Sequence, residues 1–251
     1  MADVMGKALI SSFLVPLIVF ACLLFSGMAI VLWIGSVGYK KTYYYEATHC
    51  GYLAMLNDKG KHGEYLLYRC LRSYEEKDCR FLFNVYLPKG EGTTEVDVLL
   101  ITPSGLIVFE SKNYSGRIYG NESQRNWTQT LPAGNKIKKE HFYNPIMQNR
   151  THIKALRAVI GDEIPVASVV VFSHRCTLAD VTVESSDVRV IKRDDALRTV
   201  SALLVSPEQA PNTVDVQKEF DLLYPFTKVT EETKKAHIKD VKETQKRFGK
   251  I

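Results

Sequence analysis

The stretch EVDVLLITPSGLIVFESKN, residues 95–113, places charged side chains inside two runs that are otherwise typical of buried strands. Apart from Asp97, residues 96–101 and 106–109 are apolar at consecutive positions, as in a sheet that is covered on both faces. The Pro-Ser-Gly sequence at 103–105 is typical of a turn. The stretch therefore predicts a central β-hairpin.

The charged residues of this hairpin are Asp97, Glu110 and Lys112. Because side chains alternate along a strand, Glu110 and Lys112 share one face. A two- or four-residue loop centred on Pro103 and Ser104 would place Asp97 directly opposite Glu110. A three-residue loop would turn Asp97 to the other face, so the chemistry depends on the turn.

Two carboxylates and an ammonium group need a reason to occupy buried strands, because an unpaired buried charge is costly. Paired carboxylates favour a hard cation such as Mg²⁺, which polarises a phosphoryl oxygen and generates a hydroxide nucleophile. The lysine would then orient water or stabilise developing charge. The alternative is a structural Asp/Glu–Lys ion pair at a strand end, since ion-pair networks also occupy such positions.

An ordered set of motifs surrounds these residues: Gly63-Glu64, Glu95-Val96-Asp97, the run from Gly105 to Tyr114, Gly116, Gly120, Trp127, Asn144-Pro145 and Gln148. In this order the set resembles the NERD (nuclease-related) domain, a branch of the PD-(D/E)xK phosphodiesterase superfamily. The resemblance covers residues 60–160 and continues weakly to residue 205. The ordered set is specific, whereas an aspartate followed by E-x-K alone would be a weak motif.

The resemblance implies an α/β fold with a restriction-endonuclease-like core, in which helices flank a mixed central sheet. It also implies a Mg²⁺-dependent nuclease, with Mn²⁺ as an alternative ion and DNA as the expected substrate. Glu64, Asp97 and Glu110 would hold the metal, Lys112 would orient the attacking water, and Gln148 would position that lysine. Two other functions stay open: a nucleic-acid-binding module that does not cleave, and a membrane-bound scaffold.

The spacing of Glu64, Leu67 and Leu71 places them on one stripe of a helix. A carboxylate in the first turn of a helix also complements the helix dipole, and from the residues alone this structural role is favoured for Glu64. The family resemblance reverses that preference, because its first helix carries a glutamate of the metal site.

A second helix is predicted to start with Asn144 as N-cap and a proline at its first position. Gln148, His152, Ala155 and Val159 lie on one of its stripes, so Gln148 begins the buried face. A buried glutamine usually satisfies a backbone group, but the resemblance assigns this one to the site. His152 is interpreted as a capped or solvated histidine and is not counted as catalytic.

Basic residues gather around this helix: Lys136, Lys138 and Lys139 precede it, and Arg150, Lys154 and Arg157 lie on its other face. They could follow the phosphates of a nucleic acid, although a solvated basic face is the commoner meaning of such a run.

Further strands are expected at 80–87, 114–120, 127–131, 166–172 and 188–191, with a closing helix at 194–204. Trp127 is interpreted as a packing residue. The resulting order is helix, three strands, helix, strand.

Residues 8–37 are almost wholly apolar, and about 20 such residues suffice for a helix that crosses a bilayer. A cleaved signal peptide is the alternative, but its apolar core is usually only about 7–15 residues long. Lys40 and Lys41 follow the run while Lys7 alone precedes it, which predicts a single-pass protein of the cell membrane with its C-terminal part in the cytoplasm.

The 251 residues thus divide into an anchor and interfacial segment at 1–45, a nuclease-like domain at 46–206 that opens with a linker at 46–62, and a polar extension at 207–251. That extension is expected to be an exposed helix or a disordered tail without catalytic residues. A net charge of +5 permits a polyanionic partner without requiring one. The five cysteines show no zinc-binding spacing and are expected to be reduced.

Overall fold

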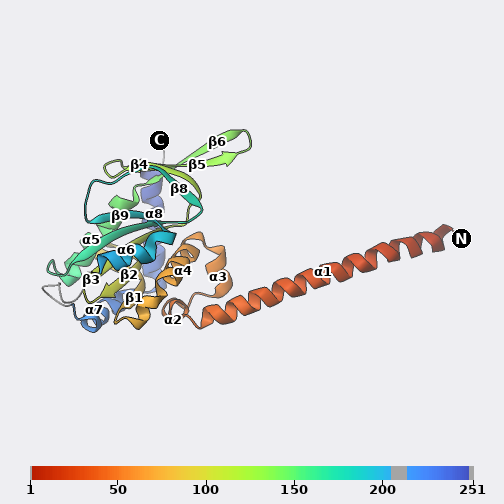
Figure 1. The fold of residues 1–251 in the computed structure, drawn as a ribbon, viewed down its shortest axis with the longest axis horizontal. Helices are drawn as coiled ribbons and strands as arrows, with labels where there is room; N and C mark the ends of the chain where they lie inside the picture. The colour runs from red at the N-terminus through yellow and green to blue at the C-terminus, as the bar shows by residue number, and fades with distance from the viewer. Residues whose placement is uncertain (1, 205–213, 249–251) are drawn as a thin grey trace. The chain divides into compact units, whose positions relative to one another are not determined.

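The structure is a computed structural model that describes residues 2–204 and 214–248 (Figure 1). The chain divides into two compact units between Ala54 and Met55. Helix α1 (Ala2–Lys40) dominates the first unit. Among the described residues, its segment Leu14–Lys40 is long and apolar enough to cross a membrane, a property that signal sequences share. The predicted N-terminal apolar helix is confirmed.

The expected linker at 46–62 is helical instead. Helices α2 (Tyr43–Thr48), α3 (Tyr52–Asn57) and the start of α4 (Lys59–Leu71) occupy it. The reason lies in the caps: the side chain of Thr42 accepts a backbone N–H at the start of α2, and the carboxylate of Asp58 accepts two at the start of α4.

The second unit contains a five-stranded sheet in the order β1-β2-β3-β7-β9. Its strands are β1 (Arg80–Lys89), β2 (Gly92–Thr102), β3 (Gly105–Lys112), β7 (Val166–Phe172) and β9 (Val188–Lys192). The first three are antiparallel neighbours, whereas β3, β7 and β9 run parallel to one another. All five strands were predicted from the sequence.

A four-stranded sheet has the order β6-β5-β4-β8. Its strands are β4 (Gly116–Asn121), β5 (Asn126–Ala133), β6 (Lys136–Tyr143) and β8 (Cys176–Thr182). The sequence predicted β4 and β5 but missed β6 and β8. Most residues of β6 are exposed, so it lacks the apolar alternation that identifies a half-buried strand. Trp127 of β5 is fully buried and stacks on Phe172 of β7, which confirms its packing role.

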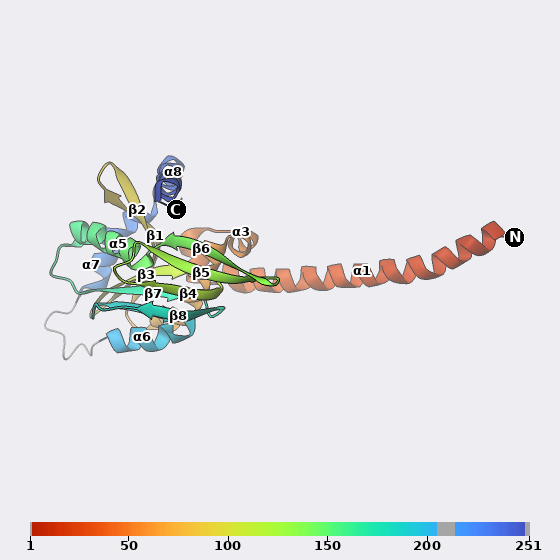
Figure 2. The same ribbon diagram turned by 90° about the horizontal axis from the view of Figure 1, so that it is seen from above.

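Helices cover both faces of the larger sheet, and α5 (Pro145–Ile160) and α6 (Ala196–Leu203) lie on opposite sides of the strands in Figure 2. On one face Tyr68 of α4 packs edge-on against Phe81 and Phe83 of β1. On the other, Leu156 of α5 shares a core cluster with residues of β1, β2 and β3. The predicted α/β class, with mixed sheets flanked by helices, is therefore confirmed.

The end of the chain differs from the expected exposed tail. Helix α7 (Val216–Leu223) buries Val216 and Leu223 in the same core cluster as α5. Helix α8 (Glu231–Phe248) is largely exposed, which agrees with the exposed helix that was expected as an alternative to a disordered tail. Residues 207–213 of the predicted extension lie outside the described residues. Short 3-10 helices complete the fold at Arg72–Glu76, Arg193–Asp195 and Tyr224–Thr227.

Candidate active site

The β2–β3 hairpin has the register on which the site depends. Pairing extends to Val98 and Phe109, and the loop consists of Pro103–Ser104 alone. One position beyond the last pair, this register sets Asp97 opposite Glu110. The two-residue loop is one of the two loop lengths that place Asp97 opposite Glu110, and both carboxylates lie on the face of the sheet that α5 covers.

Lys112 joins β3 to α5. Its Nζ atom lies 2.6 Å from Oε1 of Glu110 and donates a hydrogen bond to Oε1 of Gln148 over 3.0 Å. Burial alone would lower the pKa of Lys112, but the carboxylates of Glu110 and Asp97 raise it above its usual value. The structure thus brings together the three predicted residues Glu110, Lys112 and Gln148, and the neighbouring carboxylates favour the charged form of the lysine.

His152 also belongs to this cluster, contrary to its interpretation as a capped or solvated residue. Its Nε2 atom lies 3.0 Å from Oε2 of Glu110, and its Nδ1 atom lies 2.7 Å from Oγ1 of Thr94. All three side chains are buried. The sequence indicated this position through its spacing, because Gln148 and His152 are one helical turn apart and therefore share a face of α5.

The two opposing carboxyl groups are in different electrostatic states. Burial, the charge of Glu110 and the charge of Glu64 together raise the pKa of Asp97 well above its usual value, although the backbone N–H of Ser111 donates to its carboxylate over 3.0 Å. Burial would also raise the pKa of Glu110, but Lys112 and the hydrogen bond with His152 outweigh it and lower that pKa. Like charge is therefore concentrated around Asp97.

Glu64 lies on the wall of the same cleft. Its side chain is buried, and α4 begins at Lys59, more than a turn before it. The interpretation of Glu64 as a first-turn acid is therefore wrong. The sequence misplaced the start of the helix because it assigned the residues around the Asp58 cap to a turn.

The cleft has a volume of about 960 Å³. It is lined by all five predicted site residues, which come from α4, β2, β3 and α5. His141, Phe142 and Tyr143 of β6 add a second wall, and His237, Asp240 and Val241 of α8 add a third. His237 contacts β2 through the carbonyl of Thr93, 3.2 Å from its Nδ1 atom. The C-terminal helix thus contributes to the cleft, which the sequence did not predict.

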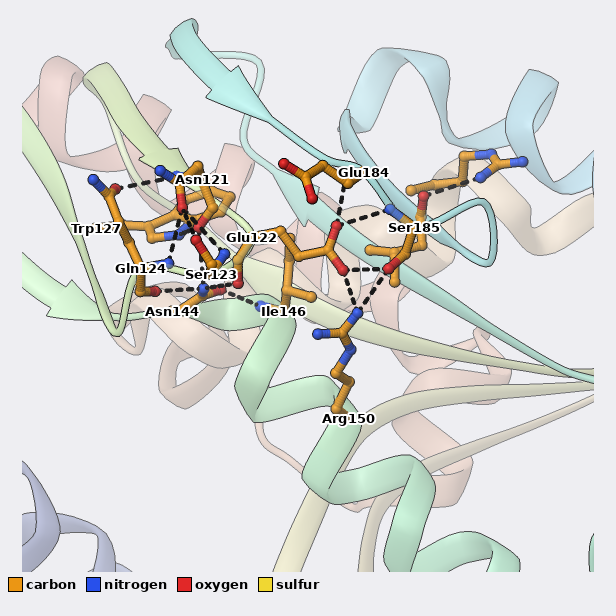
Figure 3. A network of polar contacts seen from close by, with 12 residues as sticks. Asn121, Glu122, Ser123, Gln124, Trp127, Asn144, Ile146, Arg150, Glu184 and Ser185 are labelled. Carbon is orange, nitrogen blue, oxygen red and sulfur yellow. Dashed lines mark hydrogen bonds and ion pairs between the residues drawn. The ribbon is translucent and has the colours of Figure 1, made fainter.

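Asn144 fixes the start of α5, the helix that carries Gln148 and His152 (Figure 3). Its Oδ1 accepts the N–H of Ile146, which confirms the predicted N-cap. Its Nδ2 donates to the carbonyls of Glu122 and Gln124 over 2.9 and 2.6 Å. The turn after β4 is thereby tied to the end of the helix that faces the cleft.

The carboxylate of Glu122 extends this network, as Figure 3 shows. It accepts the backbone N–H groups of Glu184 and Ser185 over 2.7 and 2.9 Å, the hydroxyl of Ser185, and a charged hydrogen bond from Arg150 of α5. The hydrogen bonds from Ser185 are the main reason that the pKa of Glu122 falls to about 2. Arg150 is therefore held by a carboxylate within the fold.

The side chains that line the cleft have the oxygen ligands that a divalent cation requires. Glu64, Asp97 and Glu110 supply only carboxylate oxygens, the ligands that Mg²⁺ prefers, and burial together with the charges of Glu110 and Glu64 raises the pKa of Asp97. Within the described part of the chain, no three His, Cys, Asp or Glu side chains already form a metal-binding shell. The residues fit the ion by chemistry and charge.

Comparisons with known proteins agree with this geometry. The profile of the family described as "Nuclease-related domain" (NERD) matches residues 59–173, which contain every predicted site residue. An uncharacterized protein of Bacillus anthracis is 34% identical over 183 residues, a region that covers 72% of this chain and 82% of the relative. No solved structure gives a significant match. The chain therefore belongs to the NERD, or nuclease-related domain, family.

Proposed function

We propose that this protein is a membrane-anchored, metal-dependent nuclease of the PD-(D/E)xK type that hydrolyses phosphodiester bonds, with DNA as its substrate. One observation carries the proposal: the ammonium group of Lys112 is held between Glu110 and Gln148, beside Asp97, in an open cleft. Such a fixed cation can stabilise the charge that develops on a phosphate during hydrolysis. The open cleft distinguishes this arrangement from a structural ion pair, which would not need access to a ligand.

Glu64, Asp97 and Glu110 would hold Mg²⁺, or Mn²⁺ in its place. When bound, the ion supplies a Lewis acid for the phosphoryl oxygen and lowers the pKa of a coordinated water molecule. The protein's own contribution is to place the carboxylates on neighbouring strands and on α4. The raised pKa of Asp97 supports a cation here, because a positive charge would relieve the repulsion among these groups.

Lys112 has a role that does not require proton transfer. Its raised pKa keeps it protonated, so it acts as a positive charge and hydrogen-bond donor toward the attacking water or the phosphate. Gln148 directs the ammonium group by accepting one of its hydrogens. His152 holds the second oxygen of Glu110 and so orients that carboxylate from behind.

The membrane part of the proposal rests on α1. Residues 8–37 would form the anchor, residues 46–206 the nuclease-like domain and residues 207–251 an extension. Lys40 and Lys41 after the apolar run favour a cytoplasmic location for the domain. Protease treatment of sealed vesicles tests this, because a domain shielded within the lumen, or a mature chain without its N-terminus, would reject the topology.

Cleavage by the full-length protein and by Lys112→Ala, purified side by side, tests the activity. Single- and double-stranded DNA and RNA are incubated with Mg²⁺ or Mn²⁺. The substitution should reduce cleavage by about 10²-fold or more, the scale of losing one preorganised electrostatic group. Equal cleavage by both preparations would point to a contaminating nuclease. A wild type that binds nucleic acid without cutting it would leave the non-cleaving module as the better account.

A further inference from the structure

The hairpin formed by β5 and β6 extends beyond the sheet to which it belongs. Strand β4 pairs with β5 only at residues 128–130, so residues 131–138 have no third strand beside them. The turn is tight, with Gly134 at a φ of +59°. Figures 1 and 2 both show the closed end of this hairpin projecting from the rest of the second unit. Residues 131–139 are called the arm below.

The arm is basic and exposed. Lys136, Lys138 and Lys139 are all exposed, and the neighbouring β5 carries no acidic residue. Glu140 is the one acidic residue of β6, and it pairs with Lys138 over 2.5 Å. The arm therefore keeps a net positive charge in a protein whose overall charge is only +5.

The arm is continuous with the cleft. The other end of β6 supplies His141, Phe142 and Tyr143 to the cleft wall. At about 3.3 Å per residue, Lys139 lies about 7 Å and Lys136 about 17 Å along the strand from His141. Phosphates follow one another at about 3.4 Å along the axis of one DNA strand, so these distances correspond to about two to five base pairs.

We propose that the arm binds the phosphate backbone of duplex DNA that flanks the bond in the cleft. This inference rests on the proposed function and deepens it, because it identifies the part of the protein that contacts DNA outside the cleft. The lysines would contact phosphates without reading sequence, because phosphate contacts position a protein and base contacts specify it. The arm would thus favour substrates with duplex on that side of the cleft.

Two other roles give different results in the test. Lysines protect exposed edge strands such as β6 from pairing with other chains. The tip also carries Ile137 with 71% of its surface exposed, and lysines around an apolar residue suit an anionic membrane. The continuity of β6 with the cleft favours DNA over both.

The experiment measures binding of a duplex DNA oligonucleotide to the full-length protein in detergent, without divalent ions, as a function of salt. The arm variant carries Lys136→Gln, Lys138→Gln and Lys139→Gln. A control variant with the same net charge carries Lys77→Gln, Lys218→Gln and Lys228→Gln, three exposed lysines outside the cleft lining. Melting temperatures of both variants are compared with that of the wild type to confirm folding.

Lys136 and Lys138 project from one face of β6 and Lys139 from the other, so one DNA backbone contacts two of the three lysines. Each phosphate contact contributes about 0.9 to the slope of log K against log salt concentration, so the arm variant should lower the slope by about two. The control should match the wild type. Unchanged slopes in the arm variant would leave edge protection as its role, and equal loss in both variants would show a general charge effect. If the DNA slope is unchanged in the arm variant, and the arm lysines of the wild type reconstituted into vesicles are protected from trypsin by anionic but not by neutral lipid, the arm is assigned to the membrane. Each of the last three results, namely an unchanged slope, an equal loss in both variants or a membrane contact, overturns the inference.

Failure of the proposed function looks different in the same preparations. If the wild type binds DNA with a steep slope that depends on the arm, yet cuts nothing when Mg²⁺ is added, the nuclease assignment fails while the arm stands. If the wild type cuts DNA and the arm variant keeps its slope, the arm fails while the nuclease stands. A wild type that does not bind DNA rejects the arm as well.

Discussion

The imidazole of His152 and the carboxylate of Glu110 meet at 3.0 Å inside the protein, with 4% and 1% of the two residues exposed. The contact occupies the carboxylate oxygen that Lys112 leaves free. Glu110 therefore has a partner on each oxygen, and its orientation is set before any ligand arrives.

Replacing His152 should destabilise the fold. In His152→Phe the carboxylate of Glu110 loses a buried partner, and such a loss costs about 1–3 kcal/mol. Urea unfolding followed by fluorescence measures it. Thr94→Val removes the hydroxyl group that contacts the other ring nitrogen of His152. The double variant should therefore lose less unfolding free energy than the sum of the losses in the two single variants. Strict additivity would show that the three residues do not act together.

Asp97→Asn should raise the melting temperature of the metal-free protein, because it removes one of the carboxylates that repel each other in the cleft. Added Mg²⁺ or Mn²⁺ should stabilise the wild type by mass action but leave this variant unaffected. Calorimetry with and without metal measures both effects. Asp162→Asn, at an exposed position, is the control and should respond to metal like the wild type. An equal response in Asp97→Asn would make the carboxylates structural.

Glu122 should make stability sensitive to acid. Its pKa is about 2 in the folded protein against 4.5 when unperturbed, so the unfolded chain binds the proton first as pH falls. The stability that Glu122 contributes is complete above pH 4.5 and is lost as pH falls towards 2. Glu122→Gln should therefore be less stable than the wild type at neutral pH, and the difference should shrink across that window. Glu163→Gln, an exposed control, should show no such convergence.

Gly63 allows α4 to approach β3. A Cβ atom at this position would lie 2.9 Å from Cβ of Asn113 and 3.1 Å from Oγ of Ser111. Gly63→Ala gains about 1 kcal/mol of helix propensity, but overpacking typically costs about 1–3 kcal/mol, so we expect a net loss of stability. The next residue is Glu64, so the response of the melting temperature to metal should also weaken. Gly92→Ala, which meets nothing closer than 3.9 Å, is the control and should leave that response unchanged.

The central hairpin could be predicted because its determinants are local. A two-residue loop at Pro103–Ser104 fixes which residues oppose each other, and strand alternation then places Glu110 beside Lys112. The cap at Asn144 is equally local, and it fixes the helical phase of Gln148. These features needed no knowledge of distant contacts.

The missed features depend on tertiary contacts. The helical spacing placed His152 on the buried face of α5, but its partners Glu110 and Thr94 come from other elements. Strand β6 pairs with β5 without an apolar face of its own, so its periodicity gave no signal. Helix α7 is short, and only its packing on the sheet shows that Val216 and Leu223 are core residues.

The position of β3 has a consequence for how the protein moves. Strand β3 pairs with β2 on one side and with β7 on the other, so its amides are hydrogen-bonded deep within the sheet. Its amide hydrogens should exchange with solvent only through global opening, whereas those of the arm and of α8 should exchange through local fluctuations. The charges of Glu110 and Lys112 would then keep fixed positions over long times, while the walls of the cleft that α8 and β6 supply fluctuate locally.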